Sequence, residues 1–532
     1  MRTKTVVLMP LSLLALIFAL YGQFLWNPIV FDDLPFFMLD ERGNQPVSGY
    51  HFSLFELRSL PYATLAWGKA AFGLDMLHFR VENLLLHAAV SIALFFFLAR
   101  LFDAVYGTRA DSLLGVHTLA FAAALFFALH PVAVYAVGYL VQRTIVMATL
   151  FSLLAMLAYL HGSVRRQPQW LWASVPLYYL AVFSKEHAIM LPAVLLALTV
   201  LLHEDWREKL KQRWVIFALL ALIALFVVAA KKGILGSTYE IYAPEMLGVD
   251  SDLNHPLSVL TQSWLFFKYA GLWLFPNPAW MSVDMREPFA SSLLSPYLLA
   301  LMGFAAWGGG ALWLLIKRGR LGLLGLAMLF PWLMFMPEFS TVRIQESFVL
   351  YRSYLWAAGA CCVLPLLLDA LDKRMAAIIV SVVALALFPV SMERLSSFGH
   401  PLMLWDDAEK LVKDRLELPG VYRIYYNRGT EFSKVDEYDL AIRDLSLAGK
   451  LNPEWPFPYN NLGVAHAKKG DWRAAVAAFT QAIEIAKRKN MGLNPRPYFG
   501  RAMAYEELGE VELAKRDYQI TCKAVNKGCE KL

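Results

Sequence analysis

The stretch "NNLGVAHAKKGDWRAAVAAFTQAIEIAKR", residues 460 to 488, decides the fold of the C-terminal part of the chain because it recurs. "YNRGTEFSKVDEYDLAIRDLSLAGKLNPE", residues 426 to 454, aligns with it at a period of about 34 residues, which matches Gly429 with Gly463 and Ala441 with Ala475. A third copy, "FGRAMAYEELGEVELAKRDYQITCKAV", follows after a short insertion around "NMGLNPRP". Self-similarity at this period is typical of stacked helix pairs.

The repeated pattern is that of the tetratricopeptide repeat (TPR). In such repeats, small residues allow two antiparallel helices to approach, and large apolar residues fill the space between neighbouring repeats. We expect about three repeats within an extracytoplasmic domain over residues 393–532. Stacked repeats form a surface that binds a peptide or protein partner. The alternative is that three repeats only bury a core and serve as a cap or an assembly contact.

The chain as a whole is too apolar for an ordinary soluble assembly of domains, because 58% of its 532 residues are hydrophobic and only 17% are charged. Helices of roughly 20 apolar residues are expected to span a membrane. We expect about eleven such helices in a domain over residues 1–392. They are placed near 5–26, 81–101, 113–129, 144–161, 169–184, 187–202, 214–230, 296–316, 321–337, 348–370 and 375–391.

The basic residues predict the orientation of this domain. They fall in short clusters between the apolar runs, where Lys and Arg mark the cytoplasmic side, so the net charge of +6 does not indicate a nucleic-acid partner. All the basic clusters fall on one side of the membrane if residues 263–276 do not cross it and form a re-entrant or interfacial segment on the outer face. The alternative is that this segment crosses the membrane. The N-terminus is then cytoplasmic and the repeats lie outside. The sequence therefore predicts an all-α fold, a polytopic membrane domain followed by a TPR α-solenoid.

Two adjacent carboxylates, Asp32 and Asp33, follow the first apolar run in "NPIVFDDLPFF". They are the start of a solvated loop, or an N-cap for a helix that begins near Pro35, or a functional pair. Burial beside lipid raises the pKa of a carboxylic acid, and like charges repel, so one of the two could serve as a base.

Further polar and ionisable residues are expected on the same outer side, and groups of this kind at membrane depth indicate a functional site. Basic side chains can hold a phosphate, and a carboxylate can deprotonate an acceptor hydroxyl, so the mixture suits sugar transfer from a lipid phosphate. The carboxylates and histidines show no metal-ligand spacing, which predicts a metal-independent reaction without a cofactor. The candidates are Arg58, Asn83, His87, His130, Arg143, Lys185, Glu186, Arg343, Glu346, Arg352 and Tyr354.

In this order the motifs resemble the transmembrane-and-tetratricopeptide protein O-mannosyltransferase family and its bacterial relatives in the GT-C glycosyltransferase superfamily. The motifs are "FDD", "R-x-L" at Arg58, "N-x-x-x-H" at Asn83 and His87, "F-x-L-H-P" ending at Pro131, "R-x-x-x-x-A-T" from Arg143, "SKE" at 184 to 186, "YAGLWLFPNPAWMSVD", "QESFVLYRSYL" and the repeats.

The resemblance implies a membrane glycosyltransferase that moves a sugar from a polyprenyl-phosphate donor to an acceptor, a protein hydroxyl, on the extracytoplasmic face. Asp33 would be the base, and Asp32 would orient or bind the acceptor. Arg143, Lys185 and Arg352 would face the donor phosphate, and Glu186, Asn83 and His87 would position donor or acceptor. His130 is as readily a helix cap. Thr144 stands where the family often has an acidic residue, and the repeats are few, which leaves the sugar and the acceptor open.

Two other functions compete with transfer. A non-enzymatic membrane scaffold would recruit a cell-envelope partner through its repeats, with the polar groups serving packing. A transporter would have ionisable residues in the middle of its spans and internal pseudo-symmetry. The sequence shows neither feature clearly. We expect a bacterial inner membrane with the repeats in the periplasm. Cys522 and Cys529 would pair there if the compartment is oxidising.

Overall fold

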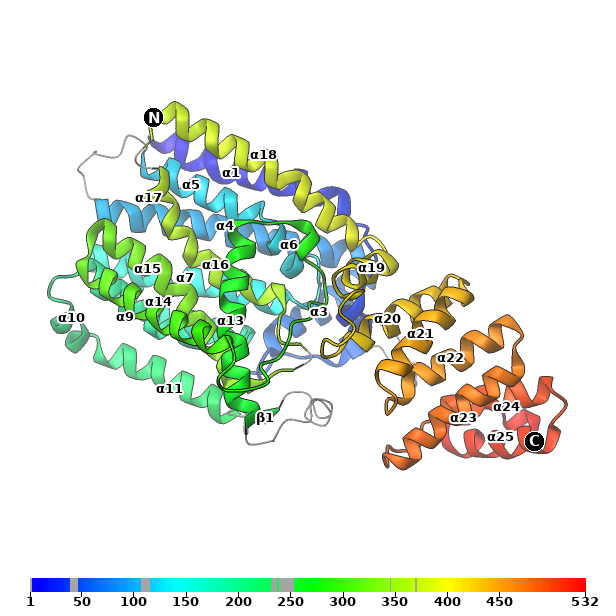
Figure 1. The fold of residues 1–532 in the computed structure, drawn as a ribbon. Helices are drawn as coiled ribbons and strands as arrows, with labels where there is room; N and C mark the ends of the chain where they lie inside the picture. Colours follow the sequence, from blue (N-terminus) through cyan, green and yellow to red (C-terminus); the bar gives the residue numbers. More distant parts are fainter. Residues whose placement is uncertain are drawn as a thin grey trace. The chain divides into compact units, whose positions relative to one another are not determined.

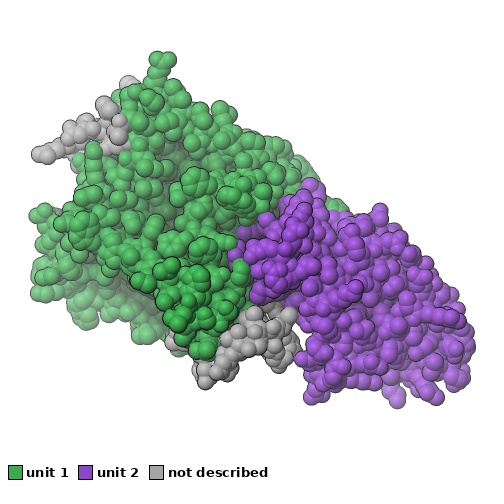
Figure 2. Space-filling model, viewed as in Figure 1, with its two compact units in different colours: residues 1–281, 288–400 green, residues 282–287, 401–532 purple. Residues whose placement is uncertain are grey.

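The chain forms two compact units of helices in the computed structural model (Figures 1 and 2). Unit 1 comprises Met1–Met281 and Pro288–His400, and unit 2 comprises Ser282–Glu287 and Pro401–Leu532. The expected domain boundary after residue 392 falls inside the last helix of unit 1. The structure describes residues 2–38, 46–106, 115–230, 237–238, 253–344, 346–368 and 371–532.

Unit 1 is built from mostly apolar helices that range from 4 residues in α2 to 31 residues in α4. Its one sheet among the described residues is a parallel pair of two-residue strands, β1 (Ser237–Thr238) and β2 (Thr341–Val342). The helices are α1 (Arg2–Tyr21), α2 (Leu34–Phe37), α3 (Ser59–Phe72), α4 (Met76–Tyr106), α5 (Val116–Ala128), α6 (Pro131–Val137), α7 (Arg143–Arg165), α8 (Pro168–Ser184), α9 (Leu191–Leu202), α10 (Trp206–Gln212), α11 (Trp214–Ala230), α13 (Asn254–Leu274), α14 (Tyr297–Lys317), α15 (Gly319–Phe335), α16 (Ser353–Ala360), α17 (Leu364–Leu368) and α18 (Lys373–Ser397).

Seven helices in the described part of the chain are long and apolar enough to cross a membrane, or up to nine if each of two bent pairs is one span. Every segment that the sequence marks as a span is largely helical here. One of them, residues 348–370, divides among short helices. The span expected over 113–129 ends at a bend of 64°, beyond which α6 follows α5. Residues 263–274 form the C-terminal half of α13, so the expected interfacial segment is regular helix up to Leu274.

The helix pair α7 and α8 depends on a glycine. A Cβ added at Gly162 would lie 2.8 Å from the backbone nitrogen of Leu171 and 2.9 Å from the carbonyl oxygen of Gln167. Any larger residue would push the two backbones apart. The close approach fixes the turn that brings the end of α7 beside the start of α8.

Unit 2 is an array of antiparallel helix pairs. Its helices are α19 (Pro401–Val412), α20 (Val421–Lys434), α21 (Tyr438–Leu451), α22 (Pro456–Lys469), α23 (Trp472–Arg488), α24 (Pro495–Glu507) and α25 (Val511–Val525). The three predicted repeats are the pairs α20–α21, α22–α23 and α24–α25. The all-α, repeat-containing fold expected from the sequence is confirmed.

Small residues sit where the repeats pack most tightly, as the alignment predicts. A Cβ at Gly463 would lie 2.7 Å from the ring of Phe479, and one at Gly429 would lie 2.9 Å from Leu445. Ala441 is fully buried in its helix pair. Its matched residue in the next repeat, Ala475, is equally buried, in a cluster with Phe479. The glycines and alanines therefore mark the contact surfaces of the helix pairs.

A buried ion pair joins the two helices of the first and third repeats but not of the second. Arg428 donates to Asp444 at 2.7 Å, and at the equivalent positions Arg501 donates to Asp517 at 2.7 Å and 3.0 Å. In the second repeat the alignment places Leu462 and Ala478 at these positions. One fold thus accepts either a paired charge or an apolar pair between its helices.

We predict that Asp517→Ala lowers the opening free energy of α25 by about 2 kcal/mol, because it leaves the Arg501 guanidinium without its carboxylate. The double change Arg501→Leu/Asp517→Ala reproduces the second repeat and should recover most of the loss. Hydrogen exchange of α25 amides in the full-length protein measures both effects. Glu512→Ala removes an exposed ion pair with Lys515 and is the control. A double variant as unstable as the single one would contradict the idea.

Candidate functional site

Asp33 is the last residue of η2 (Phe31–Asp33), a 3-10 helix of one turn, and it is fully buried. Its two carboxylate oxygens accept backbone N–H groups, from Leu140 at 3.1 Å and from Val141 at 2.9 Å. Burial raises the pKa of Asp33 to about 6, and these hydrogen bonds oppose part of the rise. Because both oxygens hold the loop between α6 and α7, the geometry favours a positioning role for the carboxylate that the sequence suggests as base.

Asp32 turns the other way. It is only partly buried, and it interacts electrostatically with Tyr62 of α3 and with Tyr351 of the 3-10 turn η8 (Leu350–Arg352). Neither tyrosine is among the candidates from the sequence. Asp32 therefore interacts with these two tyrosines, whereas the charges that act on Asp33 are those of Arg80 and Arg143.

Arg58, Lys185 and Glu186 meet between α3 and α8. Arg58 Nε donates to Glu186 Oε2 at 3.0 Å, a second guanidinium nitrogen donates to Oε1, and the backbone N–H of Arg58 donates to Phe183. Lys185 is buried, and its Nζ donates to Gln142 and to Thr144, each at 3.3 Å. Burial, followed by the charge of Arg58, lowers the pKa of Lys185 well below its usual value.

A second part of the same region holds Arg352. Its Nη1 donates to Glu338 Oε2 at 3.1 Å, while the other oxygen of Glu338 lies 2.8 Å from His187 Nε2. All three side chains are buried. Sequence reasoning misses Glu338 and His187 as site residues. Their one signal is an ionisable group bordering an apolar run, which also marks many structural positions.

The electrostatic partners of Lys185 and Tyr351 add Arg343 and Glu346 to the region. We call this set the ion cluster. It contains as many carboxylates as basic side chains, so both kinds of group have partners within the protein. Its members are Asp32, Arg58, Lys185, Glu186, Glu338, Arg343, Glu346 and Arg352, with Tyr62, Tyr351 and His187 beside them.

Arg143 and Asn83 form a separate buried group. Arg143 Nε donates to Asn83 Oδ1 at 2.7 Å, and the other guanidinium nitrogens bond Thr64, the Phe79 carbonyl and Glu82. Asn83 in turn donates to the carbonyl of Tyr139 at 3.2 Å. Each of the three guanidinium nitrogens is used within the protein, so the structure favours a packing role for Arg143 rather than a contact with a donor phosphate.

The two histidine candidates also bond within the protein. His87 Nδ1 lies 2.7 Å from the Tyr354 hydroxyl, and its Nε2 lies 3.1 Å from the Ala128 carbonyl. His130 accepts the N–H of Val132 and caps α6, which is the structural alternative that the sequence suggests. Its ring stacks on Trp273 at 4.2 Å. Within the described residues, no three His, Cys, Asp or Glu side chains are grouped to hold a metal ion.

Unit 2 contains a cavity of about 550 Å³ between α22, α23 and α24, which we call the repeat pocket. The insertion that separates the second and third repeats forms one wall, with Met491 and Leu493. Phe457 lines it from α22 and is 39% exposed, while Leu493 is 60% exposed. Asn460 adds a polar group to a lining that is otherwise mostly apolar.

The comparison with protein families identifies a tetratricopeptide repeat at residues 456–489. Heat shock protein STI1 of Saccharomyces cerevisiae is 29% identical over 83 residues, 15% of this chain and 14% of that protein. Human serine/threonine-protein phosphatase 5 is 30% identical over 96 residues, 18% of each chain. The chain therefore spans less than a fifth of these two relatives.

Small glutamine-rich tetratricopeptide repeat-containing protein 2 of Mycosarcoma maydis is 29% identical over 97 residues, 18% of this chain and 28% of the relative. A crystal structure of the APC/C hetero-tetramer Cut9-Hcn1 aligns with 87% of this chain and 80% of its own, at 13% identity and a TM-score of 0.21, a value too low to indicate a common fold. The matches support the repeat part of the resemblance and do not bear on its glycosyltransferase part.

We predict that Asp33→Asn speeds hydrogen exchange at the amides of Leu140 and Val141 by about tenfold or more. The asparagine offers one acceptor and turns its NH₂ group toward the other backbone N–H. Asp32→Asn, a change at the adjacent carboxylate, is the control and should leave the exchange rates of both amides unchanged. Exchange measured by mass spectrometry on the full-length protein tests this, and equal exchange in the two variants would remove the positioning role.

Proposed function

We propose that the protein is a membrane-anchored binding protein whose repeats hold an extended segment of a partner protein in the repeat pocket. The observation that carries the proposal is the pocket itself, because it lies on a matched tetratricopeptide repeat and is walled by the insertion between repeats. Stacked repeats of this kind commonly present such surfaces to peptides.

The lining indicates what the partner presents. Phe457, Ile483 and Leu493 offer apolar surface, and Asn460 offers an amide that can bond a peptide backbone. Lys487 lies over the ring of Tyr498 at 5.9 Å and adds positive charge at the pocket. An apolar side chain close to a carboxylate in an extended peptide fits this chemistry.

Anchoring of unit 1 in a membrane is part of the proposal. It is supported by the seven long apolar helices and by outward apolar side chains that water would not favour, such as Leu299 at 71% exposure on α14 and Leu385 at 73% on α18. The disulfide between Cys522 and Cys529 supports an oxidising, extracytoplasmic location for unit 2.

We expect peptide-display selection against the full-length protein to enrich sequences that pair an apolar residue with an acidic one. Leu493→Asp should weaken a selected peptide at least about tenfold, because it puts a charge into the apolar wall. Leu513→Asp, on an exposed position of α25 away from the pocket, is the matched control. Calorimetry or fluorescence anisotropy measures the affinities. Equal affinity for both variants would place the peptide elsewhere.

Glycosyl transfer is the second candidate function, favoured by one observation. Six candidates that the sequence places in three distant segments, and Asp32 with them, gather in the ion cluster of unit 1. In this proposal Asp32 is the base that deprotonates the acceptor hydroxyl, and the arginines bind the phosphate of a polyprenyl-linked sugar on the extracytoplasmic face of a bacterial inner membrane. The proposal needs no metal or cofactor.

We expect Asp32→Asn to abolish one glycan of the cell envelope, as deletion of the protein would, while Asp75→Asn, an exposed carboxylate outside the cluster, preserves it. Mass spectrometry of envelope glycoproteins and lipid-linked sugars, at equal membrane levels of the variants, makes the comparison. If deletion leaves every glycan in place, the transferase function is wrong and the binding function stands alone.

A further inference from the structure

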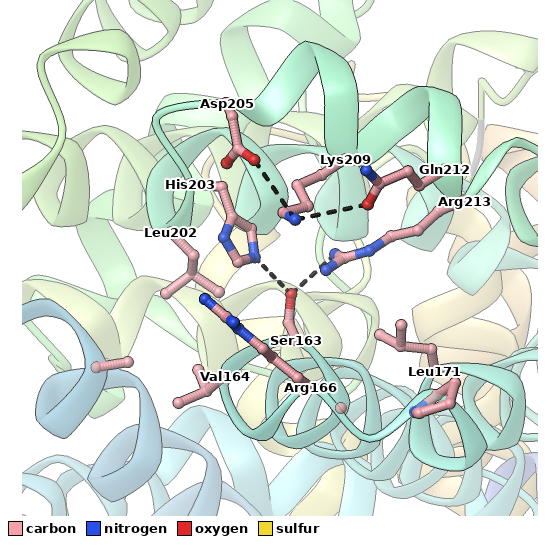
Figure 3. Close-up of a pocket in the computed structure, with 13 residues that line it drawn as sticks. Ser163, Val164, Arg166, Leu171, Leu202, His203, Asp205, Lys209, Gln212 and Arg213 are labelled. Atoms are coloured by element: carbon pink, nitrogen blue, oxygen red, sulfur yellow. Dashed lines mark hydrogen bonds and ion pairs between the residues drawn. The ribbon is translucent and has the colours of Figure 1, made fainter.

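Unit 1 contains a second polar region, at the other end of α9 from the ion cluster. A cavity of about 580 Å³ opens between the end of α7, the start of α8 and the short helix α10, and Figure 3 shows the residues around it. Its volume lies in the range of about 300 to 1,000 Å³ that small-molecule sites occupy. We call it the basic pocket.

A fixed polar floor underlies the basic pocket. Arg213 is buried, and its Nη1 donates to Ser163 Oγ at 2.8 Å and to the Tyr159 hydroxyl at 3.1 Å. His203 Nε2 lies 2.8 Å from the same serine oxygen. Burial, followed by the nearby charge of Arg213, lowers the pKa of His203. The side-chain partners of Arg213 on this floor are thus hydroxyl groups, which leave its positive charge in place.

The rim adds more positive charge. Lys209 forms an ion pair with Asp205 at 3.4 Å. Asp205 is the one acidic residue among the described residues that line the pocket. Arg166 is exposed, and its backbone N–H donates to the Gly162 carbonyl. Its side chain makes no hydrogen bond or ion pair with any residue that the structure describes. Figure 3 shows the side chains of Arg166, His203 and Arg213 around Ser163. With Arg166, Lys209 and Arg213 against Asp205, the lining has an excess of cations.

We propose that the basic pocket binds the phosphate group of an anionic ligand, with Arg166, Lys209 and Arg213 as the contacting cations. Phosphate accepts several charge-assisted hydrogen bonds, and a guanidinium presents two donors in the matching geometry. Arg213 is held ready by Ser163 and Tyr159, so binding does not have to order it.

The other wall of the pocket indicates that the phosphate belongs to a lipid. Val164, Leu171 and Leu202 line it with apolar side chains. Basic pockets between membrane helices on the cytoplasmic side are typical sites for anionic headgroups. The lipid source rests on the proposal that unit 1 spans a membrane, whereas the phosphate chemistry does not. Free phosphate is the alternative source.

The test uses the purified full-length protein and two double variants that remove equal charge. Arg166→Gln/Lys209→Gln alters the rim of the pocket and spares the buried Arg213. Arg165→Gln/Lys211→Gln alters neighbouring exposed residues that do not line it. Native mass spectrometry and fluorescence titration at physiological ionic strength measure binding of dioleoyl phosphatidic acid, dioleoyl phosphatidylcholine and inorganic phosphate.

We expect wild type to prefer phosphatidic acid over phosphatidylcholine, and the rim variant to lose about tenfold or more in affinity while the control stays near wild type. If inorganic phosphate binds with the same sensitivity and the lipids do not, the pocket takes free phosphate and the lipid source is wrong. Equal affinity in both variants, or no preference for the anionic ligands, overturns the proposal. The peptide experiment concerns unit 2 and fails or succeeds independently.

Discussion

The cost of burying charge is the constraint on which unit 1 depends. A charge inside an apolar helical unit must find partners, since an unpaired one is far more costly than a lost contact. Asp33 meets this demand with two backbone N–H groups of the loop that joins α6 to α7. These two hydrogen bonds hold the segment that follows α1 in place. The adjacent Asp32 is thereby turned toward Tyr62 and Tyr351.

The helices of the fold are predictable because their signals are local. The period of the repeats and the length of the apolar runs are properties of short segments, so the alignment alone identifies Gly463 and Ala475 as packing positions of unit 2. The breaks are not predictable in the same way. The bend of 64° after α5 follows from Pro131, which cannot donate to the helix, and from His130, whose ring nitrogen accepts the N–H of Val132.

The candidate site is predictable in its residue types but not in its directions. Sequence alone does not say which of two adjacent carboxylates turns inward, because that choice depends on Leu140 and Val141, more than a hundred residues away. The pairing of His187 with Glu338 spans 151 residues and has no local pattern. The resemblance places Arg143 against a phosphate, yet its hydrogen-bonding groups lie against Asn83, Thr64 and Phe79.

The ion cluster and the basic pocket differ in what their charges require. Glu186 begins the helical segment that His203 follows, so the two regions are about 25 Å apart along one helix axis. In the cluster, carboxylates such as Glu338 already neutralise the arginines, and a bound phosphate would have to compete with them for Arg352. In the pocket, Asp205 alone among the lining residues opposes Arg166, Lys209 and Arg213. An anion in the basic pocket would neutralise the excess of positive charge. In the ion cluster, an anion must first displace a carboxylate from an arginine. Glycosyl transfer at the cluster therefore requires Arg352 or Arg58 to exchange its carboxylate for the donor phosphate.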